Sequence, residues 1–456
     1  MRTPRFLLLL LLMAATVCSA QRRARHRTVV ADVKPVVPTI GMAQVPVVQE
    51  ETLTAEAATE NVAGEAQAWT AQPLTSQVQQ AATGTWEAYV QHALDSLCQS
   101  PMFQTTQLGL CVYDLTAGQP LYAINSAHRM RPASCQKVIT AVTALSCLKG
   151  NYQLRTDFRT TGQVSNRILE GDLIVVGGMD PLVTVDEMQA AAISIRSKLG
   201  IDSIAGSVIY DLSMREDAPY GWGWCWDDDY GPLSALLVDG RASFPEHWVE
   251  ALLMAGIRLR TIIDGSLQKG VESKSVYAIT HPIDQLLEPM MKKSDNIMAE
   301  CLFYQTAAAS GQKQAGQKQV ARRTDELTRR LGLNPDNYVV ADGSGLSLYN
   351  YTSAEHLVAM LRHAWQTPDI RQHLLPSLPI AGVDGTLKKR MTGTPAEGNV
   401  RAKTGTVTGV ISLAGYLTTP ARHTLAFAII NQGVPSANMA RAFQDKVCQA
   451  MCSPMP

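Results

Sequence analysis

Ser134 and Lys137 stand three residues apart in a stretch whose apolar residues, Val138 to Leu145, predict a buried helix. On such a helix the two side chains lie one turn apart on the same face. The Ser134 hydroxyl would sit at the helix start, beside free backbone N–H groups and the positive end of the helix dipole. Burial lowers the pKa of a lysine, so Lys137 could take the Ser134 proton and create a nucleophile. This spacing also occurs by chance, so the alternative for the pair alone is a capping serine beside a lysine that reaches solvent.

Two further short signatures carry groups that could take part in the same chemistry. Ser294-Asp295-Asn296 lies between two predicted helices, and Lys403-Thr404-Gly405 lies on a predicted strand. Ser294 and Lys403 could pass a proton to a leaving group, and Asn296 could bind a substrate amide. Each has an ordinary explanation when taken alone: Ser294 as a helix cap, Lys403 as an exposed charge and Gly405 as a bulge. The three signatures together, in this order, favour the chemical explanation.

The elements expected to position these groups alternate in an α+β order. Helices are predicted at 86–98, from Ser134 to Gly150, at 248–253, at 283–291, around 298–303 and at 437–451. Strands are predicted at 108–114, 120–124, 338–341, 411–417 and 424–430. The first two strands should form a hairpin, and the last two should pair antiparallel.

Residues 151–235 predict a smaller α/β domain, inserted between main-domain segments 85–150 and 236–456. Its expected elements are strands at 173–176 and 207–210 and a helix at 185–199. Aromatic and acidic residues gather near its end, namely Tyr220, Trp222, Trp224, Trp226, Tyr230 and Asp227 to Asp229. They could form a sugar-stacking or cation-binding loop. We favour an aromatic clasp that holds the insert to the core.

The first 20 residues predict a secretory signal peptide. Two arginines precede an apolar run, Phe6–Ala15, that is too short to span a bilayer, and Cys18-Ser19-Ala20 supplies a cleavage site. Cys18 could instead carry a lipid, although Val17 fits that signal poorly. We expect an exported, periplasmic protein with no transmembrane segment in the mature chain. Residues 21–84, rich in Ala, Gln, Thr, Val and Pro, predict a disordered linker.

Charge and residue usage argue against several other classes. Lys+Arg and Asp+Glu are both 40, so no charge excess indicates nucleic acid as a partner. Eight cysteines follow the signal peptide without a C-x-x-C pair, which argues against a zinc ribbon. His356 and His363 are expected to form a solvated stripe on a helix rather than a metal site. We predict no metal and no cofactor.

From about Trp86 to Met451 the sequence resembles the D-alanyl-D-alanine carboxypeptidase/endopeptidase family, the class C low-molecular-mass penicillin-binding proteins. The ordered S-x-x-K, S-D-N and K-T-G triplet, typical of penicillin-binding proteins and β-lactamases, carries the resemblance. Further stretches support it: Gly171–Leu173, Gly177–Pro181, Tyr230–Leu236, Asp342–Ser347, Gly382–Leu387 and Arg401–Thr406. The resemblance implies a β-lactamase/transpeptidase-like domain, in which an antiparallel sheet is flanked by helices. Two departures are that a further β-rich segment usually follows Leu236 in the family, and that Leu348 stands where an Arg is common.

The resemblance also implies a serine-type D-Ala-D-Ala carboxypeptidase/endopeptidase. Ser134 would attack the carbonyl carbon of the D-Ala-D-Ala bond to form an acyl-enzyme, and Lys137 would take its proton. Ser294, assisted by Lys403, would relay a proton to the leaving amine. Asn296 would bind the substrate amide.

Substrate binding is implied for the residues around the third signature. The backbone N–H groups of Ser134 and Thr406 would form the oxyanion hole. Lys403 and Thr404, next to Gly405, would hold the terminal carboxylate. The expected partners are therefore peptidoglycan peptides and β-lactams, and the oligomeric state stays open.

Two alternatives remain. A β-lactamase or esterase would share the acyl-serine chemistry, but efficient β-lactamases of the S-D-N type need a carboxylate that activates the deacylating water. No Glu-x-x-Leu-Asn stretch occurs between Ser294 and Lys403. The other alternative is a catalytically silent cell-wall binding protein, which the intact triplet argues against.

The resemblance further implies that the first and last helices pack side by side. Cys98 ends the first helix, and Cys448 and Cys452 lie in or just beyond the last one. A disulfide from Cys98 to Cys448 or Cys452 is therefore one expectation. The alternative is that all eight cysteines are small buried hydrophobic residues.

Overall fold

The computed structural model describes residues 73–225, 228, 231–265, 272–308 and 314–455. All of these residues belong to one unit, Ala66–Pro456. The predicted signal peptide, and the predicted linker as far as residue 72, lie outside the described residues. Within the described ranges, no helix combines the length and the apolar character needed to cross a membrane.

The last residues of the segment predicted as a linker pack on the folded domain. Leu74, in the 3₁₀ turn η1 (Leu74–Ser76), is 1% exposed and belongs to the main core. Gln91 Nε2 donates a hydrogen bond to the Gln79 carbonyl at 2.9 Å. Residues from 73 onward are therefore part of the fold, because Leu74 provides apolar surface to bury.

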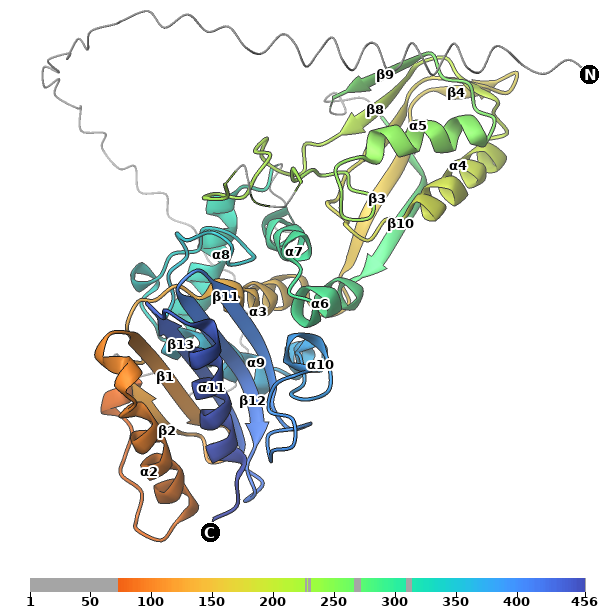
Figure 1. Cartoon of the computed structure of the whole chain (residues 1–456). Helices are drawn as coiled ribbons and strands as arrows, with labels where there is room; N and C mark the ends of the chain where they lie inside the picture. Colours follow the sequence, from red (N-terminus) through yellow and green to blue (C-terminus); the bar gives the residue numbers. More distant parts are fainter. Residues whose placement is uncertain (1–72, 226–227, 229–230, 266–271, 309–313, 456) are drawn as a thin grey trace, which may run out of the picture. The chain divides into compact units, whose positions relative to one another are not determined.

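A five-stranded antiparallel sheet forms the centre of the main domain (Figure 1). Its strands, in spatial order, are β11 (Arg401–Val407), β12 (Val410–Thr418), β13 (Thr424–Gln432), β1 (Gln107–Asp114) and β2 (Gln119–Ile124). The predicted antiparallel pairs β1–β2 and β12–β13 are confirmed. β1 also pairs with β13, from Gln107↔Gln432 to Asp114↔Leu425. The sheet thus joins strands from the two ends of the domain.

Helices cover both faces of this sheet. α2 (Trp86–Cys98) and α11 (Ala437–Cys452) pack on one face, where Val90 and Val447 share a core with Phe427. The other face carries α3 (Gln136–Leu148) and α9 (Ala354–Gln366). The same layer includes α6 (Ile283–Lys292), α7 (Asn296–Ala308), α8 (Gln317–Arg330) and α10 (Pro368–Ser377). Short 3₁₀ turns lie at η2 (Pro101–Gln104), η4 (Pro335–Asn337) and η5 (Gly385–Leu387). The α+β arrangement of an antiparallel sheet flanked by helices is confirmed.

A second sheet and two helices form the insert. Its strands, in spatial order, are β10 (Lys274–Pro282), β3 (Gln153–Thr160), β6 (Leu173–Val176), β8 (Ser207–Asp211) and β9 (Thr261–Asp264). α4 (Val185–Leu199) and α5 (Phe244–Met254) share an apolar core with this sheet around Phe158 and Trp248. A small third sheet contains β4 (Gln163–Ser165), β5 (Ile168–Glu170) and β7 (Ser203–Ile204). The predicted helix at 185–199 and strands at 173–176 and 207–210 are present.

The insert extends past residue 235, where the sequence analysis placed its end. β9 pairs with β8, and β10 pairs with β3, so both strands and α5 complete the insert rather than the main domain. β10, the last strand of the second sheet along the chain, ends at Pro282, and α6 follows directly. The difference has a physical cause, since local periodicity identifies a strand but not its partner. Lys274, for example, pairs with Thr160 from far upstream.

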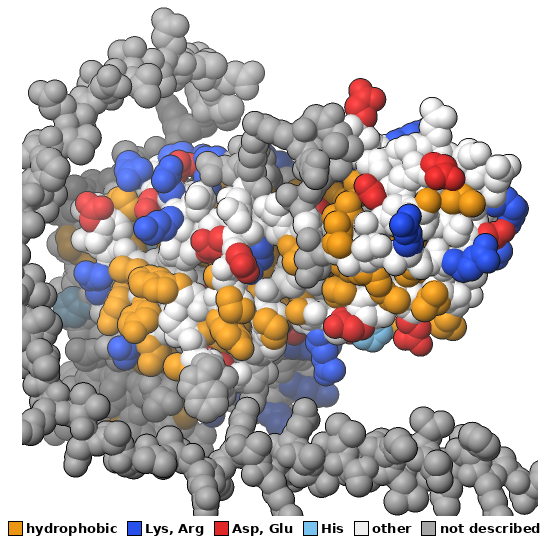
Figure 2. Space-filling model, turned by 90° about the horizontal axis from the view of Figure 1, so that it is seen from above, with side chains coloured by type: hydrophobic (Ala, Val, Ile, Leu, Met, Phe, Trp, Pro, Cys, Tyr) orange, Lys and Arg blue, Asp and Glu red, His pale blue; other side chains and the backbone are white. Residues whose placement is uncertain are grey.

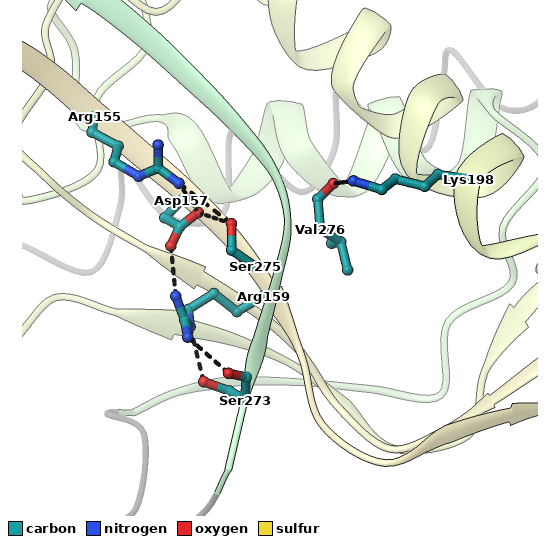
Figure 3. Close-up of polar contacts among 7 residues, drawn as sticks. All are labelled: Arg155, Asp157, Arg159, Lys198, Ser273, Ser275 and Val276. Carbon is teal, nitrogen blue, oxygen red and sulfur yellow. Dashed lines mark hydrogen bonds and ion pairs between the residues drawn. The ribbon is translucent and has the colours of Figure 1, made fainter.

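Polar side chains reinforce the pairing of β10 with β3 (Figure 3). Asp157 accepts hydrogen bonds from Arg155 at 2.8 Å, from Arg159 at 2.9 Å and from the Ser275 hydroxyl at 2.6 Å. Arg159 also donates to the Ser273 hydroxyl and carbonyl, both at 2.8 Å. Arg155, Asp157 and Arg159 lie on the more exposed side of β3, whereas the residues that alternate with them are buried.

The surface shown in Figure 2 carries charges of both signs. Lysine, arginine, aspartate and glutamate side chains are interspersed over the described part of this face, without an extended field of one sign.

Two smaller expectations from the sequence are wrong. Residues 338–341 do not form a strand, since Val339 makes only an isolated bridge with Tyr351. His356 is not solvated but 1% exposed, with its ring nitrogens 3.0 Å from Thr328 Oγ1 and 2.9 Å from Thr352 Oγ1. Burial lowers the pKa of His356 to about 3, so it is a neutral core residue.

The first and last helices pack together as expected, but the expected disulfide is absent. Cys98, Cys448 and Cys452 are free thiols, as are the other five cysteines of the described chain. Cys448 and Cys452 are buried in the core between α2, α11 and the sheet. Burial raises the pKa of Cys448 well above its ordinary value, which keeps this thiol protonated.

Trp248→Ala tests where the insert ends. Trp248 is fully buried, and its ring lies 4.6 Å from the Phe158 ring on β3. We expect the change to destabilise the insert by about 3–5 kcal/mol, as for other buried aromatic truncations. Hydrogen exchange should accelerate in β3, β6 and α4 while β1 and β13 stay protected. Faster exchange centred on β1 and β13 would assign Trp248 to the main domain.

Candidate active site

Ser134 lies in a 3₁₀ turn, η3 (Ala133–Cys135), that leads directly into α3. Ala133 has a φ of 47°, in the left-handed region that non-glycine residues seldom adopt. The chain approaches this turn closely from two sides. A Cβ at Gly345 would collide with the Ala133 carbonyl oxygen, and a Cβ at Gly405 would press on the backbone of the turn. The turn, and with it the Ser134 hydroxyl, is therefore held between a loop and β11.

Lys137 lies one turn further along α3 and is completely buried. Its Nζ lies 3.2 Å from Ser134 Oγ, 2.6 Å from Asn296 Oδ1 and 2.8 Å from the Ser344 carbonyl oxygen. Burial lowers the pKa of Lys137 to about 8, although nearby acidic groups, Asp342 first among them, act in the opposite direction. With a pKa of about 8, about a tenth of Lys137 is unprotonated at pH 7, far more than of an ordinary lysine, and this form can accept the Ser134 proton.

The second signature crosses the start of α7. Ser294 has a φ of 63°, again in the left-handed region, and Asp295 Oδ1 accepts a hydrogen bond from the Met298 N–H at 3.0 Å. This contact satisfies a free N–H group of the first helical turn. Asn296, the first residue of α7, points its Oδ1 at Lys137. The strained residue Ser294 is consistent with a functional constraint.

Lys403, on β11, faces Ser294 from the other side. Lys403 Nζ donates to Ser294 Oγ at 2.9 Å and to the Thr404 carbonyl oxygen at 2.8 Å. Lys403 is completely buried. Burial, followed by repulsion from Lys137, lowers the pKa of Lys403 to about 7.

The remaining residues of the third signature line β11 beside the turn. Thr404 Oγ1 donates to Thr386 Oγ1, in η5, at 2.8 Å. Gly405 is buried at the close approach to η3, where a side chain cannot fit. Thr406 is exposed, and its hydroxyl lies 3.4 Å from Arg441 Nη2. The lack of a Cβ at Gly405 therefore allows β11 to come this close to the turn of Ser134.

The loop Asp342–Ser347 supports the family resemblance, but its sequence predicts no role for its residues. Asp342 organises this loop by accepting hydrogen bonds from the Gly345 and Ser347 N–H groups, at 2.7 and 2.9 Å, and from the Ser344 hydroxyl at 2.9 Å. Buried side chains outside the loop also form hydrogen bonds with its backbone. The loop then supplies the Ser344 carbonyl oxygen to Lys137. No sequence signal pointed to this role, because it depends on a main-chain oxygen.

One described part of the predicted aromatic cluster also reaches this loop. Trp224 Nε1, from the insert, donates to Asp342 Oδ2 at 2.8 Å. The Trp222 and Tyr349 rings lie 5.3 Å apart and are both more than half exposed. These contacts are those of a clasp between the insert and the main domain. Trp226, Tyr230, Asp227 and Asp229 lie outside the described residues.

The three signatures meet in one place. Ser134, Lys137 and Asn296 form one chain of contacts, and Ser294 with Lys403 forms a second chain beside it. The arrangement offers a hydroxyl with an adjacent base, and a second hydroxyl with an adjacent ammonium, which is sufficient for acyl transfer. Within the described residues, no group of three or more His, Cys, Asp or Glu side chains could hold a metal ion.

Comparison with known proteins places the chain among D-Ala-D-Ala carboxypeptidases. It is 25% identical over 418 residues to a D-alanyl-D-alanine carboxypeptidase, DacB, of Haemophilus influenzae, covering 73% of this chain and 87% of the relative. It is 27% identical over 450 residues to the D-alanyl-D-alanine carboxypeptidase of Actinomadura sp. strain R39, covering 77% and 82%.

A solved structure shares the fold. Penicillin binding protein 4 (dacB) from Haemophilus influenzae superposes with a TM-score of 0.69 at 24% identity, covering 78% of this chain and 97% of that chain. The same protein has also been solved in complex with a β-lactam, with a TM-score of 0.64 to this chain.

The family profile extends through both segments of the main domain. The D-Ala-D-Ala carboxypeptidase 3 (S13) family matches residues 90–247 and 232–451, well over half of the sequence. The chain therefore belongs to the D-Ala-D-Ala carboxypeptidase 3 (S13) family.

Proposed function

We propose that the protein is a serine-type D-Ala-D-Ala carboxypeptidase and endopeptidase, which acts on peptidoglycan stem peptides and binds penicillin covalently. The observation that carries the proposal is the contact between a fully buried lysine and a serine hydroxyl, Lys137 Nζ to Ser134 Oγ at 3.2 Å. Family membership and the activity named for the relatives support the same conclusion.

Acylation begins with proton transfer from Ser134 to Lys137. The lowered pKa of Lys137, about 8, supports a neutral amine that accepts the proton. The Ser134 oxygen then attacks the carbonyl carbon of the D-Ala-D-Ala bond, and the carbonyl oxygen becomes an oxyanion. We assign the backbone N–H groups of Ser134 and Thr406 as its donors, which contribute about 3–4 kcal/mol each in comparable sites.

Collapse of this intermediate breaks the peptide C–N bond and requires a proton on the leaving amine. Ser294 gives its hydroxyl proton to that amine and regains a proton from Lys403, which lies 2.9 Å away. Asn296 orients Lys137 through its Oδ1 and offers its amide group to the substrate. Lys403 and Thr404 bind the terminal carboxylate of the substrate, where the Lys403 charge is favourable.

Hydrolysis of the acyl-enzyme completes the reaction with peptides and is slow with β-lactams. A β-lactamase of the S-D-N type uses a carboxylate to activate the deacylating water. The sequence between Ser294 and Lys403 contains no Glu-x-x-Leu-Asn stretch to supply it. A peptidase that β-lactams inhibit is therefore favoured over a β-lactamase or an esterase.

We also propose an exported, periplasmic location. The arginines, the apolar run Phe6–Ala15 and the Cys18-Ser19-Ala20 cleavage site support a signal peptide over residues 1–20. Peptidoglycan, the substrate proposed for the site, lies outside the cytoplasm.

Ser134→Ala should abolish labelling by a fluorescent penicillin, because the Ser134 oxygen is the atom that becomes acylated. Lys137→Ala should slow acylation by at least ~10², the lower end of general-base effects. Ser146→Ala, on the same helix, is the matched control, since its hydroxyl donates only to the Val142 carbonyl and lies near His363. It should label like the unchanged protein. Labelling that survives in Ser134→Ala with an intact circular dichroism spectrum would disprove the assignment of the nucleophile.

Incubation with penicillin, followed by mass spectrometry over time, should give an adduct of the intact drug that persists on Ser134. Incubation with a pentapeptide ending in D-Ala-D-Ala should release D-Ala. Together these results separate the proposed peptidase from its alternatives. Rapid turnover of penicillin would indicate a β-lactamase, and a labelled protein that releases no D-Ala from peptides or peptidoglycan fragments would indicate a silent binding protein.

A further inference from the structure

Glu300 is a buried acidic residue to which the proposed mechanism gives no part. It lies on α7 four residues after Asn296, which places both side chains on the same face of the helix. Asn296 contacts Lys137 directly, and Glu300 is 1% exposed. A carboxyl group buried this deeply is unfavourable unless its hydrogen bonds are satisfied.

The hydrogen bonds of Glu300 lead to Lys137 through the backbone of the loop. Glu300 Oε1 accepts from the Gly343 N–H and from the Ser344 N–H, both at 2.9 Å. The carbonyl oxygen of Ser344 accepts from Lys137 Nζ at 2.8 Å. The Thr140 hydroxyl of α3 holds the Gly343 carbonyl at 2.7 Å. One carboxyl oxygen therefore fixes the two consecutive peptide groups that precede the Ser344 carbonyl, the acceptor of Lys137.

We propose that Glu300 is a positioning residue for Lys137: as an uncharged carboxylic acid, it holds the Gly343 and Ser344 amides so that the Ser344 carbonyl oxygen faces the Lys137 amine. This inference rests on the proposed function, because it assumes that Lys137 is the base for Ser134. Through Asn296 and Glu300, α7 then governs two of the three contacts of Lys137, one directly and one through the loop.

The surroundings of Glu300 favour its uncharged form. Its Oε2 is buried and has no hydrogen-bond partner among the described residues. Leaving a carboxylate oxygen unpaired there costs more than leaving a neutral hydroxyl unpaired. Burial, and then repulsion from Asp342, raise the pKa of Glu300 well above its ordinary value.

The uncharged form matters because Lys137 faces several charged groups. Negative charge on Asp342, then on Glu300 if it is ionised, and then on Asp295 favours the ammonium form of Lys137, whereas Lys403 on β11 opposes it. A negative charge on Glu300 would stabilise the ammonium further and would raise the pKa of Lys137. An uncharged Glu300 fixes the geometry without lowering the fraction of Lys137 that is unprotonated at neutral pH. Tyr304, one turn on, donates its hydroxyl to Glu216 at 3.3 Å, and burial raises its pKa, so the phenol stays neutral as well.

The test is the rate of acylation by a fluorescent penicillin, measured across the pH range around the Lys137 pKa of about 8. Glu300→Ala should lower the second-order rate constant at least ~10-fold, because misplacement of a reacting group by about 1 Å can cost about 10² in rate. The acidic limb of the pH–rate profile of Glu300→Ala should also move to lower pH. Loss of the contact with the Ser344 carbonyl disfavours the ammonium form of Lys137 and so lowers its pKa.

Glu300→Gln separates position from charge. The amide oxygen can still accept from Gly343 and Ser344, so acylation should stay within about 3-fold of the unchanged protein and the acidic limb should stay in place, since no charge is removed. If Glu300 is ionised instead, removal of its charge should shift this limb to lower pH by about one unit or more. Such a shift would overturn the proposal.

Two further variants keep the test decisive. Thr306→Val is the matched control on α7, because Thr306 is buried and its hydroxyl donates to the Leu302 carbonyl within the same helix. It should retain the rate and the pH profile. Thr140→Val loosens the same loop from α3 and should act in the direction of Glu300→Ala, which preserves the test if that variant does not fold.

The outcomes distinguish the two proposals. Folded Glu300→Ala and Thr140→Val variants that acylate like Thr306→Val, with an unmoved acidic limb, would overturn the role of Glu300 while the proposed function stands. A Glu300→Gln variant as slow as Glu300→Ala would also overturn it. If the unchanged protein is not acylated at all, the proposed function fails first.

Discussion

The burial of the Lys137 amine beside Ser134 is the constraint on which the rest of the site depends. A lysine with no exposed surface loses its hydration, so its ammonium is disfavoured unless the protein supplies acceptors. Asn296 and the Ser344 carbonyl are those acceptors, and Ser134 is the third contact. The helix α7 and the loop Asp342–Ser347 must therefore be placed accurately for the base to exist. Much of the buried polar structure around them serves this purpose.

The same constraint accounts for the unusual backbone near the site. Ala133 and Ser294 both have positive φ, at a cost of about 1–3 kcal/mol each. Ala133 is next to the nucleophile, and the Ser294 hydroxyl accepts a hydrogen bond from Lys403. Gly345 and Gly405 allow the loop and β11 to approach the turn of Ser134 more closely than a side chain would permit. Two buried lysines that repel each other complete a site in which stability is exchanged for reactivity.

Local features of the fold were predictable, and long-range ones were not. The bounds of α2 and α4 and the β1–β2 and β12–β13 hairpins of the main sheet follow from periodicity and turn residues alone. The partner of β10 does not, because pairing with β3 is set by tertiary packing. Likewise, the S-x-x-K, S-D-N and K-T-G signatures pointed to residues that the fold brings together. Glu300 was missed, because it acts through main-chain amides of a distant loop and leaves no spacing to detect.

The central claim is that burial lowers the pKa of Lys137 enough to supply an unprotonated amine as the base, and the titration of Lys137 tests this claim most directly. Carbon-13 NMR of lysines labelled at Cε would follow each amine with pH, with Lys137→Arg used to assign the signal. The account predicts a Lys137 pKa of about 8, far below the ordinary lysine value of 10.5. A Lys137 signal that titrates near 10.5 in the folded protein would contradict it, because the amine would then be protonated and unable to accept the Ser134 proton.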